Sequence, residues 1–280
     1  PVAGDLVDAL RRLEYRGYDS AGIATIENGT LDRRRAEGKL KNLEQRLVKE
    51  PLQGCVGIGH TRWATHGRPT EVNAHPHMSA RVSVVHNGII ENFAELKKKL
   101  AAKGHKFETD TDTEVVVHLI ADEMLTGSTP VQATRKALAH LQGAFALAII
   151  FAGEDDLMIG ARQGSPLAIG HGHGEMYLGS DAIALAPFTS QITYLEEGDW
   201  TVLTRKGATI YDRAGKLVER PRVTSVASSL LVDKGNHRHF MAKEIHEQPE
   251  VISHTLANYI DFSKGRVSLP DLGVDPAGIT

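Results

Sequence analysis

The chain has 280 residues, of which 41% are hydrophobic and 24% charged, a composition typical of a globular protein with a sizeable core. Lys and Arg number 32 and Asp and Glu number 35, so the formal net charge is −3. This balance argues against a nucleic-acid-binding protein that depends on a basic surface. The one cysteine excludes an internal disulfide framework, and no apolar run is long enough to cross a membrane as a helix. We therefore expect a cytoplasmic enzyme that binds neither nucleic acid nor membrane.

Taken in chain order, the predicted elements begin with a helix, because apolar residues recur at helical spacing from Val2 to Leu13. Asn28-Gly29 is a strong hairpin signal between the two strands that follow. Further helices are expected where the apolar period is near 3.6, and one of them has Asp112 as its expected N-cap. Up to residue 151 the remaining predicted ranges are helices 92–102, 113–125 and 129–141 and strands 21–26, 31–35, 56–60, 82–86 and 144–151.

From residue 157 to 218 the pattern changes to short strands that follow one another closely. Neighbouring strands of this kind favour antiparallel meanders over β-α-β crossovers. We therefore predict an α+β fold with at least one antiparallel sheet. Residues 262–280 are rich in Gly and Pro, which is typical of a linker. The strands expected in the meander are 157–161, 167–169, 176–178, 200–204 and 209–211.

The sequence carries no motif for a bound nucleotide or metal. No phosphate-binding loop occurs, and the glycines of residues 170–174 have the wrong spacing for a dinucleotide site, so this segment is expected to be a turn. Three His-x-His pairs could place two imidazoles on one strand face, but no accompanying ligand motif supports a metal. We expect surface or hydrogen-bonding histidines and no metal or other cofactor. The pairs are His75/His77, His171/His173 and His237/His239.

Cys55 is the only candidate thiol nucleophile. It lies in the apolar stretch 54–59 that leads into a predicted strand, and no base is beside it. A reactive thiolate needs nearby positive charge and partial exposure, whereas a cysteine in an apolar stretch is usually a small buried hydrophobe. We therefore predict that Cys55 is structural and takes no part in catalysis.

The polar segment 60–67 follows a predicted buried strand, and a core has no need of such polarity, which indicates a loop with a binding role. Arg62 can bind a carboxylate through two parallel hydrogen bonds, and Trp63 beside it can cover the site. Farther along, Asn87-Gly88 offers a side-chain amide and a backbone N–H as paired donors to an oxyanion. The same dipeptide is also typical of an ordinary turn.

A third polar segment, residues 110–114, opens a predicted helix. One interpretation is N-capping by Asp112, and the other is an anion that holds a substrate ammonium group. An arginine for a carboxylate, an aspartate for an ammonium and paired donors for an oxyanion together form a site for an α-amino acid that undergoes acyl chemistry.

Long motifs occur across nearly the whole chain at residues 12–22 (RLEYRGYDSAG), 60–67 (HTRWATHG), 73–77 (NAHPH), 86–92 (HNGIIEN), 111–114 (TDTE), 164–167 (GSPL), 195–199 (LEEGD) and 241–249 (MAKEIHEQP). In kind and order they resemble the family of glutamine–fructose-6-phosphate aminotransferases (isomerizing), also called glucosamine-6-phosphate synthases. The resemblance is to the N-terminal glutaminase domain, a class II glutamine amidotransferase of the N-terminal-nucleophile hydrolase fold. It implies a four-layer αββα sandwich with two antiparallel sheets between helical layers.

The resemblance implies hydrolysis of glutamine to glutamate and passage of the ammonia through a channel to a C-terminal isomerase domain. There fructose 6-phosphate becomes glucosamine 6-phosphate, with no metal or nucleotide cofactor. It also implies that Arg62 binds the glutamine carboxylate and Asp112 its ammonium group, and that Asn87 and Gly88 form the oxyanion hole. The other implied site residues are Trp63 as the channel gate, Thr65 and His66 as the lining, Gly88 also in amino-acid binding, and Arg16 beside the nucleophile.

The family's nucleophile is an N-terminal cysteine whose own α-amino group is the base, on a strand ahead of the helix that begins here at Val2. The present 280 residues hold neither. We therefore expect residues 1–240 to be the glutaminase domain without its first strand, residues 241–280 to be a linker and the start of the isomerase domain, and the chain alone to be inactive. The full-length protein is expected to form a homodimer. Two alternatives stay open: a non-catalytic glutamine- or glutamate-binding module, and the glutaminase half of another class II enzyme such as amidophosphoribosyltransferase.

Overall fold

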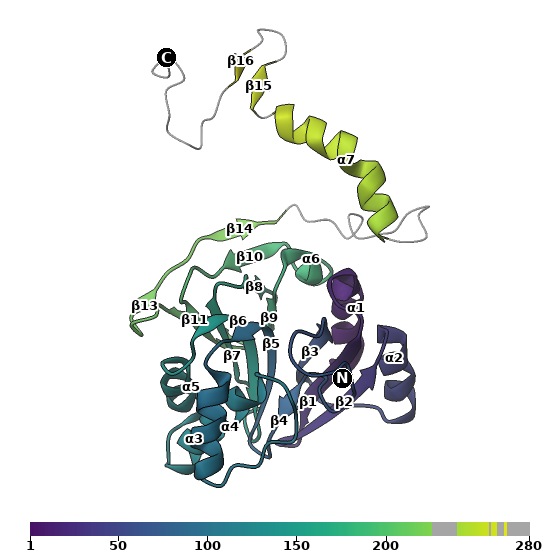
Figure 1. Ribbon diagram of the computed structural model, residues 1–280. Coiled ribbons are helices and arrows are strands. Elements are labelled where there is room, and N and C mark those ends of the chain that lie inside the picture. The colour runs from purple at the N-terminus through teal and green to yellow at the C-terminus, as the bar shows by residue number, and fades with distance from the viewer. Residues whose placement is uncertain (226–239, 258, 262–265, 268–280) are drawn as a thin grey trace. The chain divides into compact units, whose positions relative to one another are not determined.

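The computed structural model describes residues 1–225, 240–257, 259–261 and 266–267 (Figure 1). Contacts along the chain divide it into two compact units, Pro1–Leu231 and Val232–Thr280. All the sequence-predicted site residues lie in the first unit.

A seven-stranded antiparallel sheet forms the centre of the first unit, with the strand order β13-β12-β11-β7-β6-β5-β4. Its longest pairing joins β5 and β6 over nine residues, from Val82 opposite Phe151 to Ile90 opposite Gly143. The strands are β4 (His77–Met78), β5 (Val82–Ile90), β6 (Gly143–Phe151), β7 (Met158–Gln163), β11 (Trp200–Thr204), β12 (Gly207–Tyr211) and β13 (Leu217–Val218).

Three helices, α3 (Phe93–Ala102), α4 (Glu114–Leu125) and α5 (Pro130–Leu138), cover one face of this sheet. Buried side chains of the helices and of β5, β6, β7 and β11 form one continuous apolar cluster. The helix α5 begins at a capping box, in which Thr129 accepts from the backbone of Gln132 and the Gln132 side chain accepts from the backbone of Thr129.

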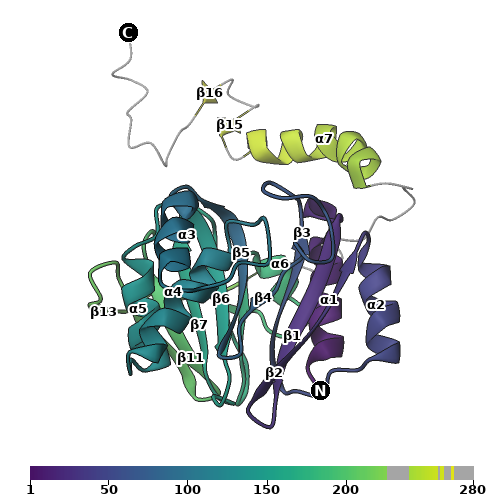
Figure 2. The ribbon, with the colours of Figure 1, turned by 60° about the horizontal axis from the view of Figure 1, so that its bottom comes forward.

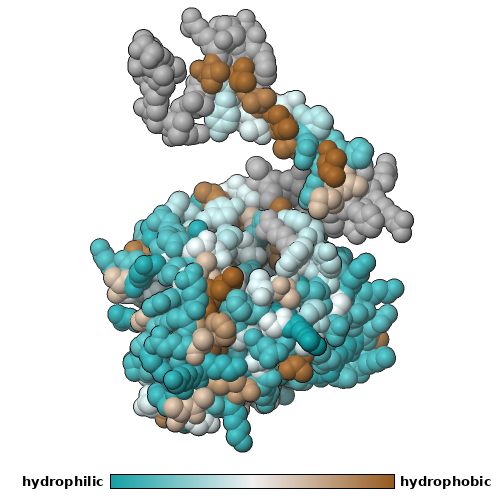
Figure 3. Space-filling model, in the orientation of Figure 1, coloured by the Kyte–Doolittle hydropathy of each residue, from teal (hydrophilic) through white to brown (hydrophobic). Residues whose placement is uncertain are grey.

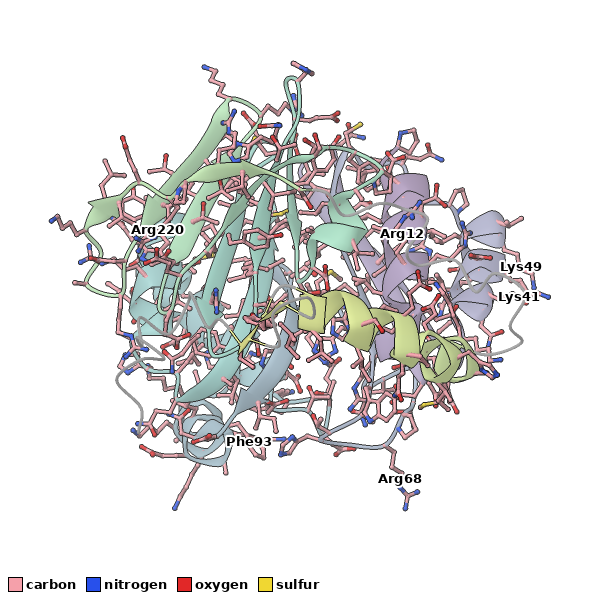
Figure 4. The ribbon with its side chains drawn as sticks, turned by 90° about the horizontal axis from the view of Figure 1, so that it is seen from above. Arg12, Lys41, Lys49, Arg68, Phe93 and Arg220 are labelled. Carbon is pink, nitrogen blue, oxygen red and sulfur yellow. The ribbon has the colours of Figure 1, made fainter. Side chains whose placement is uncertain are left out.

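The opposite face of the seven-stranded sheet meets a second layer made of two smaller antiparallel sheets, with the orders β2-β1-β3 and β14-β10-β8-β9. The strands of the first are β1 (Ser20–Glu27), β2 (Thr30–Glu37) and β3 (Val56–Arg62), and those of the second are β8 (Ala168–His171), β9 (Met176–Gly179), β10 (Gln191–Tyr194) and β14 (Arg222–Thr224). Arg220, labelled in Figure 4, precedes β14 and ties it to the body by two hydrogen bonds to the buried carboxylate of Asp199.

The helices α1 (Ala3–Leu13) and α2 (Leu40–Lys49) pack on the outer face of the β2-β1-β3 sheet. The 3₁₀ turn η1 (Glu14–Arg16) follows α1, and the short helix α6 (Ala182–Leu185) lies against α1 and β9. Figure 2 shows the resulting order of layers, from α3–α5 through the two sheet layers to α1 and α2. The predicted α+β class and four-layer sandwich are therefore confirmed, and the layer that faces α1 is divided between two sheets.

Most predicted elements occur within a few residues of their expected ends, and the hairpin at Asn28-Gly29 joins β1 to β2 with positive φ at both residues. The turn expected at residues 170–174 lies at residues 172–175, between β8 and β9, because Gly170 and His171 still belong to β8 and pair with β9. The helix α2 was missed, because its ten residues include three Lys or Arg, one Glu and only three Leu and one Val. The strand β5 was predicted to end at residue 86 but continues to Ile90.

The second unit contains α7 (Phe240–Ala257), β15 (Ile260–Asp261) and β16 (Arg266–Val267), and Pro249 lies inside α7. Large apolar side chains on α7 are exposed (brown in Figure 3), namely Met241, Ile245, Val251, Ile252 and Leu256. Among the described residues, none of the helices is long and apolar enough to cross a membrane.

We predict that Ile150→Ala lowers the free energy of unfolding by about 2–5 kcal/mol, because Ile150 is fully buried between the two sheet layers and its truncation leaves a cavity. The measurement is urea denaturation. Val48→Ala on α2 is the control, since Val48 is 83% exposed and a surface change costs within about 0.5 kcal/mol. Equal losses in the two variants would contradict the packing of the layers.

Candidate active site

A cavity of about 1020 Å³ lies in the first unit, between the two small sheets of the second layer. Its walls are α1, β3, β5, β6 and β9. Among the described strands, β3 pairs only with β1 and β9 only with β8, so each presents an unpaired edge to this cavity. Seven of the eight sequence-predicted site residues line it together: Arg62, Trp63, Thr65, His66, Asn87, Gly88 and Asp112. The eighth, Arg16, ends the turn η1, and its side chain lies outside the described part of the structure.

Asn87 and Gly88 lie within the strand β5 and pair with Ala146 and Phe145 of β6. The alternative interpretation of this dipeptide as an ordinary turn is therefore wrong. Gly88 has φ +121°, and a Cβ there would lie 2.0 Å from the carbonyl oxygen of Ala144. Only glycine fits both the backbone conformation and this close approach. The side chain of Asn87 is exposed to the cavity.

Asp112 is buried, and its Oδ2 accepts a hydrogen bond of 2.7 Å from the backbone N–H of Ile90. The interpretation of Asp112 as the N-cap of α4 is wrong, because the N-cap position is Thr113 and no side chain caps that end. The carboxylate instead ties the end of β5 to the start of α4. It thereby places a negative charge on the cavity wall, next to Asn87 and Gly88 in the strand.

Arg62 is the last residue of β3 and is only 4% exposed. Its guanidinium donates hydrogen bonds to the backbone carbonyls of His66, Gly67 and Arg68, so it holds the loop that follows β3. Burial lowers its pKa, and the nearby carboxylates of Asp19 and Asp112 act in the opposite direction. A buried guanidinium thus faces the cavity between a backbone loop and two carboxylates.

The loop after Arg62 carries the other predicted binding residues. Trp63 is 61% exposed and packs edge-on against Tyr18, with ring centroids 5.6 Å apart. The backbone N–H of Ala64, the next residue, donates to Asp19 Oδ2. The ring of His66 lies 5.3 Å from that of Phe93, which Figure 4 labels at the start of α3. The loop therefore contacts Tyr18 and Asp19 ahead of β1 on one side and the helix α3 on the other.

The sequence analysis missed a cluster of four histidines behind the site. The rings of His60 and His77 lie 4.4 Å and 4.6 Å from that of His75, and the ring of His86 lies 6.5 Å from it. Burial lowers the pKa of His60 to about 4 and that of His77 to about 3, and it lowers those of His75 and His86 as well. All four imidazoles are therefore neutral at pH 7. The signal in the sequence was the recurrence of histidine beside each polar motif.

Threonine hydroxyls hold this histidine cluster in place. The hydroxyl of Thr113 lies 2.9 Å from His75 Nε2 and 3.0 Å from His86 Nδ1, and Thr111 Oγ1 lies 3.0 Å from His77 Nε2. The pair His75/His77 is thus hydrogen-bonded, as expected. Within the described residues no group of three or more His, Cys, Asp or Glu side chains is arranged to hold a metal ion.

The pair His171/His173 does not line the cavity. His171 bonds the hydroxyl of Thr193 on the neighbouring strand β10, and His173 is exposed in the turn before β9. The pair His237/His239 lies outside the described residues.

Cys55 precedes β3 and is exposed, so its prediction as a buried residue is wrong. The apolar stretch 54–59 leads into β3, which is the edge strand of the β2-β1-β3 sheet and has a neighbouring strand along one edge. Cys55 lies seven residues before Arg62, which at roughly 3.3 Å per residue separates their backbones by about 23 Å along the strand. It is therefore at the far end of the cavity from the predicted binding residues.

Glu114 fixes the turn that carries Asp112. Its carboxylate accepts hydrogen bonds from the backbone N–H groups of Glu108 and Thr109 and from the Thr109 hydroxyl. Burial alone raises its pKa, but these bonds and the contact with His118 outweigh burial and lower the pKa to about 2.

Comparison with known proteins agrees with this geometry. A family model described as a glutamine amidotransferase domain matches residues 60–187. The glutamine–fructose-6-phosphate aminotransferase (isomerizing) of Brucella abortus biovar 1 (strain 9-941) is 68% identical over 98% of this chain and 45% of its own length. That of Bradyrhizobium diazoefficiens is 67% identical over 96% of this chain and 44% of its own length.

Two solved structures share the fold. The glutamine phosphoribosylpyrophosphate amidotransferase of B. subtilis, complexed with ADP and GMP, has a TM-score of 0.65 and 26% identity over 76% of this chain and 47% of that chain. A structure described as the allosteric regulatory enzyme of purine biosynthesis has a TM-score of 0.64 and 27% identity over 75% of this chain and 46% of that chain.

The chain matches the model of a glutamine amidotransferase domain over residues 60–187 and shares its fold with the two solved structures. Its sequence is similar, over nearly the whole chain, to the glutamine–fructose-6-phosphate aminotransferases (isomerizing), which confirms the resemblance predicted from the motifs. The chain spans about half the length of these curated relatives, 45% for the Brucella protein.

We predict that Glu114→Gln lowers the melting temperature at pH 7 and that its difference from wild type shrinks as the pH falls from about 4.5 toward 2. The folded pKa of about 2 lies below the usual value of 4.5 for a glutamate, so the carboxylate stabilises the fold above pH 4.5 and this contribution is lost on acidification. Melting curves from pH 7 to pH 3 measure it. Glu27→Gln, at an exposed strand end, is the control and should follow wild type. A difference independent of pH would contradict the assignment.

Proposed function

We propose that this chain is the glutaminase part of a glutamine–fructose-6-phosphate aminotransferase. It hydrolyses glutamine to glutamate and delivers the ammonia to an isomerase domain that makes glucosamine 6-phosphate from fructose 6-phosphate. The supporting observation is the cavity between the two small sheets, with the carboxylate, guanidinium and amide groups of Asp112, Arg62 and Asn87 on its wall. The sequence identity of 68% to a relative of that name supports fructose 6-phosphate as the acceptor of the ammonia.

The shape of the cavity supports a missing strand as its occupant. Edge strands carry unpaired backbone N–H and C=O groups that need partners when buried. The edges of β3 and β9 both face the cavity, while α1 covers it on one side and β5 and β6 on the other. One added strand would join the two small sheets into a continuous layer. We propose that a segment ahead of residue 1 in the full-length protein is this strand.

The direction of α1 supports a nucleophile at the end of that strand near Arg62 and Asn87. The backbone N–H of Val2 donates to Gly54 O beside the start of β3, and the N–H of Asp19 donates to Arg62 O at its end. The helix α1 therefore runs in the same direction as β3. A strand that enters α1 through a tight turn runs the opposite way, so its first residue lies at the Arg62 end.

The proposed chemistry uses groups that converge at this end. The thiol of an N-terminal cysteine, deprotonated by its own α-amino group, attacks the γ-carbonyl carbon of glutamine. The carbonyl oxygen becomes an oxyanion, which the amide of Asn87 and the backbone N–H of Gly88 stabilise. The C–N bond breaks, ammonia leaves with the proton from the amine, and water then hydrolyses the thioester to glutamate. Arg62 and Asp112 hold the α-carboxylate and the α-ammonium of the substrate.

The remaining assignments belong to the same proposal. Trp63 gates the ammonia channel, Thr65 and His66 line the substrate site, and Arg16 supports the nucleophile. Residues 1–240 are the glutaminase domain and residues 241–280 lead into the isomerase domain. The full-length protein is a cytoplasmic homodimer. The glutaminase half of an amidophosphoribosyltransferase is less well supported, because the solved structure of that name is 26% identical.

We predict that Asp112→Asn and Arg62→Ala each weaken glutamate binding by about 1.5–3 kcal/mol, the range for hydrogen bonds to charged groups. Asp112→Asn keeps an oxygen that can accept from Ile90 and removes only the charge. Calorimetric titration with glutamate measures the effect. Arg68→Ala is the matched control, because Arg68 lies on the same loop and is exposed (Figure 4). A non-catalytic binding module would give the same losses, so this result alone tests the pocket and not the reaction.

We predict that in the full-length protein Asn87→Ala slows glutamate release by about 10²–10³-fold, the usual cost of one oxyanion donor. Cys55→Ser should leave the rate unchanged, because Cys55 lies at the far end of the cavity. The assay is glutamate release from glutamine. A rate that disappears with Cys55→Ser would overturn the proposed nucleophile, and a wild-type protein that binds glutamate but releases none from glutamine would favour the binding module.

A further inference from the structure

Within the part of the chain that the structure describes, the side chain of Asn87 has one hydrogen-bond partner, and this partner fixes its orientation. Nε2 of His60 lies 2.8 Å from Oδ1 of Asn87. His60 comes from β3 and Asn87 from β5, so this bond crosses from one sheet layer to the other. An amide whose oxygen is engaged in this way directs its two N–H hydrogens elsewhere.

The tautomer of His60 follows from the geometry. A carbonyl oxygen can only accept, so Nε2 carries the proton and Nδ1 is bare. Nδ1 is buried and has no hydrogen-bond partner among the described residues. Were the amide of Asn87 reversed, Nδ1 would carry the proton and a buried N–H would have no acceptor. An unpaired buried donor is costly, so the orientation with Oδ1 on His60 is the stable one.

The imidazole of His60 is itself held firmly. Its backbone pairs with Gly22 inside the β2-β1-β3 sheet, and its ring stacks on that of His75 at a centroid distance of 4.4 Å. Nε2 of His75 bonds the hydroxyl of Thr113, the residue after Asp112. The donor to Asn87 and the carboxylate of Asp112 are thus parts of one packed network.

We propose that His60 is a positioning residue that holds the Asn87 amide with its N–H hydrogens directed at the oxyanion of the glutaminase reaction. This inference rests on the proposed function, in which Asn87 is an oxyanion donor. Without the bond from His60, the amide can rotate by half a turn and present its oxygen to the developing negative charge. The transition state then loses a donor and meets a repulsive dipole, while the bound substrate loses nothing.

The test is the glutaminase activity of the full-length protein with His60→Leu and His60→Gln. We expect His60→Leu to lower kcat by about 10-fold, which corresponds to one lost hydrogen bond, and to leave the KM for glutamine within about twofold. The amide nitrogen of the glutamine side chain can reach the place of Nε2, so His60→Gln should retain most of the rate. His171→Leu removes a part-buried bond to Thr193 outside the cavity and should leave kcat unchanged.

A double-mutant cycle separates positioning from a general structural role. In the Asn87→Ala background, His60→Leu should have almost no further effect on kcat, because no amide remains to be oriented. An aldehyde analogue of glutamine, which forms a tetrahedral adduct with a thiol, should bind His60→Leu about 10-fold more weakly, while glutamate binds as to wild type. If His60→Leu does not fold, His60→Asn replaces it, since its amide is too short to reach Asn87.

The outcomes are distinguishable. Equal losses from His60→Leu with and without Asn87, or an unchanged kcat, would overturn the positioning role alone. An unchanged kcat in Asn87→Ala itself would overturn the proposed oxyanion hole, and with it the proposed function.

Discussion

Ala24 and Ile58 of the β2-β1-β3 sheet pack against Val85 and Ile150 of the seven-stranded sheet, and this apolar contact fixes the distance between the layers. Two stacked sheets lie about 10 Å apart when their inner faces interdigitate. The polar groups of the site lie just beyond this apolar contact, on the same strands. Because the core sets the spacing, a bond such as that from His60 to Asn87 can span the layers without distortion.

Because side chains alternate along β5, this strand contributes both to the apolar core and to the site. Val84 packs into the cluster beneath the helices and Val85 into the cluster between the sheets. His86 then points toward the start of α4, where it meets Thr113, and Asn87 points into the cavity. Successive residues of one strand therefore pack in the core, hydrogen-bond the start of α4 and line the cavity. This is possible because the side chains of a strand alternate between two faces.

Local signals in the sequence were sufficient for much of this fold. The hairpin at Asn28-Gly29 and the amphipathic helices depend on neighbours in the chain, and their ranges were close. The segment 60–67 was found as polarity where a core needs none, Asn87-Gly88 as paired donors and Asp112 as an anion at a helix start. The cavity brings Arg62, Asn87, Gly88 and Asp112 together.

What the sequence could not supply depends on distant partners. Asn87-Gly88 reads as a turn, and only pairing with β6 keeps it in a strand. Asp112 has the sequence context of a helix cap, but its Oδ2 accepts a hydrogen bond from the backbone N–H of Ile90. The exposure of Cys55 depends on which edge of β3 is covered. The division of one layer into two sheets has the same cause, since strand order is decided by contacts between residues far apart in the chain.

The guanidinium of Arg62 has one more consequence. It holds the loop carbonyls of His66, Gly67 and Arg68, and in the proposed function it also receives the carboxylate of the amino acid. The order of the loop and the binding of the ligand therefore both depend on the five N–H donors of the Arg62 guanidinium. Two equilibria that share a group are thermodynamically coupled, and the coupling is reciprocal. An amino acid that binds Arg62 changes the stability of the loop by a certain free energy. Ordering of the loop changes the affinity for that amino acid by the same free energy. The conformation of residues 63–68 and the occupancy of the pocket are therefore linked.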